Sequence, residues 1–105
     1  MFICDCHCDT LTELYKKGTS IYANDQHFDI QRLIALGGGL QFCAIYVPTQ
    51  EFRYYGGLRY TLKYLDKYLQ EVKKLQADAI DVLQVRTKED VADVLNHKAA
   101  TLLAI

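Results

Sequence analysis

The chain has 105 residues, a length that suits one small domain. Half of its residues are hydrophobic and 24% are charged, the composition of a soluble globular protein. A net charge of −1 creates no field that would attract nucleic acid, and no apolar run approaches the roughly 18 residues of a membrane span. We therefore expect no nucleic-acid partner, no membrane segment and a cytoplasmic location.

The first predicted element is a strand over residues 2–7, which leads into the sequence Asp-Cys-His-Cys-Asp. Side chains alternate between the two faces of a strand. One face is therefore expected to carry Asp5, His7 and Asp9, and the other face Cys4, Cys6 and Cys8. An imidazole and a carboxylate two residues apart at a strand end can hold one divalent cation, and zinc suits such ligands. We predict His7 and Asp9 as metal ligands. The alternative is a hydrogen-bonded core histidine followed by an aspartate that caps the next helix.

The clustered thiols admit two further interpretations. Cysteines two apart on one strand are separated by about 6.7 Å, near the upper limit for a disulfide, which favours reduced core residues in a cytosolic protein. Cys43 is expected to be buried as well. A structural zinc site on Cys4, Cys6 and Cys8 with His7 is disfavoured, because such sites place two to four residues between paired cysteines and add a second pair, and because His7 faces away from the thiols. Asp5 either orients His7 or forms a salt link with a neighbour.

The next segments alternate between helices and a strand. A helix over residues 11–17 is expected, with Thr10 as its cap and Gly18 at its end. A second helix over residues 30–36 has Asp29 as its N-cap and stops at Gly37-Gly38-Gly39. Residues 40–47 are apolar on both faces, the pattern of a buried strand in a parallel sheet.

A long helix is predicted over residues 58–75. Apolar side chains recur at steps of three and four, which predicts a buried stripe of Leu62, Leu65, Leu69, Val72 and Leu75. A row of tyrosines at i, i+4 spacing, comprising Tyr60, Tyr64 and Tyr68, is expected to widen that face and to point its hydroxyls at solvent.

The last third of the chain predicts a short strand over residues 80–85, a helix from the capping box of Thr87 and Asp90 to Asn96, and a core strand over residues 100–105. His27 and His97 are expected in surface or capping roles. This order indicates an α/β architecture with right-handed crossovers. Because the final core strand lacks a covering helix, the chain is expected to be the opening part of a larger fold.

Several segments together resemble one enzyme family. The opening Asp5-Cys-His-Cys-Asp9 is similar to the Asp-x-His-x-Asp of the membrane (renal-type) dipeptidases, which are zinc metallopeptidases. The segment His27-Phe-Asp-Ile-Gln-Arg-Leu33 and the glycine-rich entry into Gln41-Phe-Cys-Ala-Ile-Tyr46 resemble later pieces of that family, in the same order. Residues 87–105 resemble its helix and third core strand. The similarity covers essentially the whole chain.

The resemblance implies a partial (β/α)8 TIM barrel of the metal-dependent hydrolase type, of which residues 1–105 form the N-terminal third, incomplete at the C-terminus. It implies zinc-dependent hydrolysis of dipeptides in an intact enzyme with two zinc ions, where His7 and Asp9 serve as ligands of one. The family's bridging glutamate, two further histidines and catalytic aspartate come later, so no catalytic residue is assigned here. The alternative is a non-catalytic α/β fragment or binding module that associates with a complementary chain or with itself.

Overall fold

The computed structural model describes residues 1–53 and 55–105; Tyr54, between the strand predicted over residues 40–47 and the helix predicted over residues 58–75, lies outside the described residues. The elements follow one another in this order: β1 (Ile3–Cys8), α1 (Thr10–Lys17), α2 (Ile30–Ala35), β2 (Gly39–Ala44), α3 (Gly57–Ala77), β3 (Val82–Val85), α4 (Lys88–Asp93), the 3-10 turn η1 (Val94–Asn96) and β4 (Ala99–Ala104). Every predicted strand and helix is confirmed, with ends that move by at most three residues. Of the described helices, none is long and apolar enough to cross a membrane.

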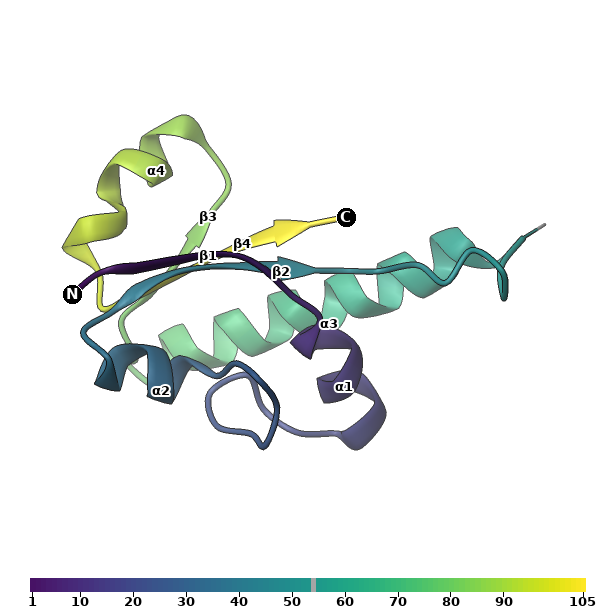
Figure 1. The fold of residues 1–105 in the computed structure, drawn as a ribbon, viewed down its shortest axis with the longest axis horizontal. Coiled ribbons are helices and arrows are strands. Elements are labelled where there is room, and N and C mark those ends of the chain that lie inside the picture. Colours follow the sequence, from purple (N-terminus) through teal and green to yellow (C-terminus); the bar gives the residue numbers. More distant parts are fainter. Residues whose placement is uncertain (54) are drawn as a thin grey trace.

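The four strands form one parallel sheet in the order β1-β2-β4-β3. The helices α1, α2 and α3 lie on one face of this sheet, and α4 lies on the other (Figure 1). The direction of strand addition explains the change of face. The chain passes outward from β2 to β3 and then steps back to β4, so crossovers of one hand place α3 and α4 on opposite sides. The expected α/β class with a parallel sheet is confirmed.

The face covered by α1, α2 and α3, called the packed face below, carries the larger core. Fully buried side chains from three elements meet there, among them Leu11 and Leu14 of α1, Ile30 of α2 and Tyr68 of α3. Tyr68 donates or accepts a 2.8 Å hydrogen bond with the hydroxyl of Thr101 on β4. Burial raises the pKa of Tyr68 to about 12, so its hydroxyl stays protonated and the bond persists.

The opposite face, called the α4 face below, has a smaller core. Val85, Val94 and Ala100 are buried there, and Leu40, Leu83 and Leu102 pack against them while partly exposed. Apolar side chains therefore line both faces of the central strands, as expected of a parallel sheet.

The buried side of the long helix α3 agrees with its leucine spacing only in part: Val72 and Leu75 are buried and Leu65 packs against the core. Tyr64 and Tyr68 are buried, whereas Leu62 and Leu69 are 52% and 41% exposed. The expectation that the leucines form the buried stripe is wrong for these two positions, and so is the expectation that the Tyr68 hydroxyl points to solvent. The reason is that Thr101 gives this hydroxyl a buried partner, which lets the large ring enter the core without losing a hydrogen bond.

Candidate metal centre

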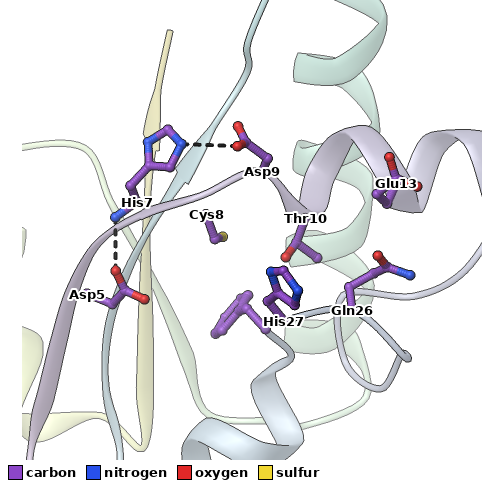
Figure 2. A pocket seen from close by; sticks show the side chains of 9 residues that line it. Asp5, His7, Cys8, Asp9, Thr10, Glu13, Gln26 and His27 are labelled. Carbon is purple, nitrogen blue, oxygen red and sulfur yellow. Dashed lines mark hydrogen bonds and ion pairs between the residues drawn. The ribbon is translucent and has the colours of Figure 1, made fainter.

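The predicted ligands meet at the carboxyl end of β1. The Nε2 atom of His7 and the Oδ2 atom of Asp9 are 3.2 Å apart, and the two side chains are 65% and 61% exposed (Figure 2). The alternative of a histidine in the core is excluded by this exposure. An imidazole and a carboxylate thus stand together at the sheet edge where side chains from neighbouring parallel strands also emerge.

Local backbone geometry directs Asp9 towards His7. Asp9 occupies the N-cap position of α1, but its backbone is not extended, and its side chain makes no capping hydrogen bond. The expected cap, Thr10, is instead the first helical residue, so that prediction is wrong. Because the helix does not use the Asp9 carboxylate, this group is available to the imidazole or to a cation.

Asp5 acts on the backbone of the motif. Its Oδ1 atom accepts a 3.1 Å hydrogen bond from the backbone amide of His7. The pairing of β1 with β2 is irregular between Asp5 and Cys8, so the simple alternation of side chains expected across the motif is interrupted there. Asp5 therefore fixes the irregular segment that presents His7, and its carboxylate contacts the main chain at this residue.

The thiols separate into two environments. Cys4 and Cys6 are exposed, so the expectation of a buried thiol row is wrong for both, because β1 is an edge strand and the core of the α4 face is formed by side chains of β2, β3, β4 and η1. Cys8 and Cys43 are buried as expected and are register partners on neighbouring strands. The hydrogen bond between these two thiols lowers the pKa of Cys8 and raises that of Cys43. All four thiols are free, as predicted.

A cavity of about 420 Å³ adjoins the His7–Asp9 pair (Figure 2). Its lining comes from β1, α1 and the loop before α2, and comprises Asp5, His7, Cys8, Asp9, Thr10, Glu13, Gln26, His27 and Phe28. Sequence reasoning missed Glu13 and His27 as members of this cavity. No pattern in the sequence links them to the motif.

The loop that carries His27 reaches the cavity because two buried carboxylates hold it. Glu71 of α3 accepts a 2.8 Å hydrogen bond from the amide of Ile21, and Asp29 accepts one from the amide of Asn24. Asp29 also caps α2 through the amide of Arg32, as predicted. His27 is exposed, as expected for a surface residue. It nevertheless belongs to the wall of the candidate site.

The donor set fits half of a zinc coordination shell. Imidazole nitrogen and carboxylate oxygen are both ordinary zinc ligands, and a tetrahedral site takes four ligands in total. Within residues 1–53 and 55–105, no cluster of three or more histidine, cysteine, aspartate or glutamate side chains is arranged to hold a metal ion. The pair can therefore contribute to a metal centre, and the described residues do not complete one.

Comparison with known proteins gives no relative: no protein-family model, curated protein or solved structure matches this chain.

Proposed function

We propose that this chain supplies two first-strand metal ligands, His7 and Asp9, to a zinc-dependent dipeptidase of the membrane dipeptidase type. The observation that carries the proposal is the 3.2 Å approach of His7 Nε2 to Asp9 Oδ2 at the carboxyl end of β1. Both groups are exposed and adjoin a cavity large enough for a small ligand. The ordered sequence resemblance supplies the reaction class and the dipeptide substrate.

The proposed architecture is the opening portion of a (β/α)8 barrel. In this proposal β1, β2 and β4 are three neighbouring barrel strands, since they lie side by side and parallel. The short β3 is an added strand. It pairs only with Ala99–Leu102 of β4, so the last residues of β4 keep a free edge on that side where a further strand can pair. The remaining ligands would come from later strands, as the resemblance implies.

The chemistry follows from the two ligands and their surroundings. Bound zinc would polarise a scissile carbonyl and make a water nucleophilic near neutral pH. To bind it, His7 must present a neutral Nε2 and Asp9 an ionised carboxylate. The Asp5 hydrogen bond to the His7 amide restrains the main chain that carries the imidazole, which reduces the freedom lost when the ligand binds.

A second candidate function is favoured by one specific observation. Leu58, Leu62 and Leu69 leave an exposed apolar row on α3, with 74%, 52% and 41% of their surface accessible. Such a row is typical of a surface that pairs with another chain. On this alternative the chain is a non-catalytic α/β module that associates with itself or with a complementary chain.

Zinc titration by calorimetry tests the ligand assignment. We expect weak zinc binding by the 105-residue chain, and loss of that binding in His7→Ala and in Asp9→Ala. His27→Ala is the matched control, because this imidazole lines the same cavity outside the motif. Zinc binding that survives His7→Ala but is lost in Cys6→Ala would replace the proposal with a thiolate site.

Activity assays test the dipeptidase assignment. The purified 105-residue chain should show no measurable dipeptide hydrolysis, because two ligands leave the metal shell open. Hydrolysis at ordinary enzyme rates by this chain alone would contradict the proposal. The reading frame beyond the codon of Ile105 gives a second check, since a Glu-Gly pair shortly after it is expected for the enzyme and not for an independent binding module.

A further inference from the structure

His97 lies between two carboxylates on opposite sides of its ring. Its Nδ1 atom is 2.7 Å from Oδ1 of Asp81, which precedes β3, and its Nε2 atom is 3.0 Å from Oδ2 of Asp93, the last residue of α4. An ionised carboxylate only accepts hydrogen bonds, whereas a neutral imidazole donates from one nitrogen only. Both contacts are satisfied together only when His97 carries both protons and a positive charge.

Each carboxylate is also held on its second oxygen. The backbone amide of Lys98 donates a 3.1 Å hydrogen bond to Oδ2 of Asp81, and Nδ2 of Asn96 donates a 2.7 Å bond to Oδ1 of Asp93. These donors keep both carboxylates ionised and aimed at the ring. The charged groups that face His97 are therefore Asp81 at the β3 end, Asp93 on α4 and the adjoining Lys98, whose charge also favours ionised Asp81.

This three-residue cluster stands where α4 has few other attachments. Each of the six residues of α4 remains exposed or half-exposed, and the apolar anchor of this segment is Val94 at the start of η1. The capping box of Thr87 and Asp90 stabilises the first turn of α4 from within and does not tie it to the sheet. The ring of His97, bonded to Asp93 and to Asp81, links the end of α4 to the strand region.

We propose that His97 is a pH-dependent latch. In its charged form it fastens α4 to the chain before the amino ends of β3 and β4, and on losing its proton it allows α4 to detach from the sheet. A neutral ring can donate to one aspartate only, so the other contact becomes two facing acceptors. Detachment that also withdraws Val94 would uncover the apolar side chains that pack against its cluster, Leu40, Leu83 and Leu102. The latch is independent of the proposed metal centre, since it lies before the amino ends of β3 and β4.

The direction of the pH effect follows from the three groups. The hydrogen bond with Asp81, and then the one with Asp93, raise the pKa of His97 above its ordinary 6.5. The bonds from His97 and the Lys98 amide lower the pKa of Asp81, while Asn96 and then His97 lower that of Asp93. The latch is therefore fully closed at pH values that lie above the ordinary aspartate pKa and below about 6.5. It opens as the pH rises through the raised pKa of His97.

Two measurements on the 105-residue chain test the latch. In an NMR titration of the histidine ring protons, the midpoint of His97 should lie above the ordinary 6.5, and Asp81→Asn and Asp93→Asn should each lower it. In amide hydrogen exchange, corrected for the intrinsic rate at each pH, the protection of α4 should fall roughly two- to fivefold between pH 6 and pH 9, the scale of a part-exposed ion pair. Amides of β2 should keep their protection.

Substitutions separate the latch from other pH effects. His97→Gln should make α4 protection low and independent of pH, while His27→Gln should leave the pH dependence intact. If His97→Gln does not fold, Asp93→Asn gives the same comparison with the ring in place. Asp90 does not confuse the result, since the amides of Arg86 and Thr87 lower its pKa and keep it ionised throughout. A His97 midpoint at or below the ordinary 6.5, or α4 protection unchanged across this range, would overturn the proposal.

Discussion

The two faces of the sheet are held by different physical means. On the packed face, α1, α2 and α3 bury large apolar side chains, and the core encloses the hydrogen bond of Tyr68 to Thr101. On the α4 face, a small apolar cluster is supplemented by part-exposed charges around His97. Apolar burial gives most of the free energy of folding, whereas exposed ion pairs give little. The packed face should therefore determine global stability, and the α4 face should open locally first.

The largest expected effect is a cavity in the packed face. Leu14→Ala removes a side chain with no exposed surface and should lower the free energy of unfolding by about 2–5 kcal/mol. Leu95→Ala is the matched control, since this leucine is 75% exposed on the α4 side and should change stability by at most about 0.5 kcal/mol. Urea denaturation followed by circular dichroism measures both. Similar losses in the two variants would contradict the division between the faces.

A smaller loss is expected when the buried carboxylate of α3 is changed. Glu71 accepts hydrogen bonds from the amide of Ile21, the hydroxyl of Ser20 and the ammonium of Lys67. Burial opposes its ionisation, but these donors prevail and lower the pKa of Glu71. Glu71→Gln keeps the shape and removes the charge, and should cost about 2–3 kcal/mol at pH 7.

The loss of stability in Glu71→Gln should depend on pH in a direction that the lowered pKa of Glu71 determines. Because the pKa of Glu71 is lower in the folded state, its contribution is present above the ordinary value of 4.5 and is lost as pH falls through the lowered one. The difference in unfolding free energy between the two proteins should shrink as denaturation is repeated at progressively lower pH. A difference that stays constant would mean that packing, rather than charge, makes the contribution.

On the α4 face, truncation of the apolar anchor should cost less still. Val94→Ala removes two buried carbon atoms, which corresponds to about 1.6 kcal/mol. Since α4 is expected to open on its own, the loss should appear more strongly in hydrogen exchange of Lys88–Asp93 than in global denaturation. Uniform loss of protection across β2 and α4 would show that the two faces unfold as one unit.

The helix ends could be predicted from local sequence signals. The caps at Asp29 and Thr87 and the left-handed Gly18 were predictable because each acts within one turn of chain. Leucine spacing alone wrongly placed Leu62 and Leu69 in the buried stripe of α3 and did not predict the depth at which Tyr68 lies. The partner that draws Tyr68 inward, Thr101, is 33 residues away, and periodicity within a helix holds no information about it.

The strand order and the cavity lining depend on similarly distant contacts. The sequence predicts four strands but not that β4 inserts between β2 and β3, since that choice is made by packing across the whole sheet. At the candidate site, the pairing of His7 and Asp9 was predictable from their spacing. The approach of His27 was not, because the loop is positioned by Glu71 of a helix about fifty residues away.

The smallest effect on stability is expected where the proposed function is concentrated. His7 and Asp9 belong to neither core, and an ion pair between two groups exposed by more than half contributes little to folding. His7→Ala and Asp9→Ala should each change the free energy of unfolding by at most about 0.5 kcal/mol. The unsubstituted chain is expected to show a rise in melting temperature with excess zinc, because a ligand that binds only the folded state stabilises it, and the same variants should lose that rise. His27→Ala should keep that rise. Destabilisation by 2 kcal/mol or more in the absence of metal would assign His7 and Asp9 to the scaffold, and an unchanged zinc response in both variants would remove them from the metal centre.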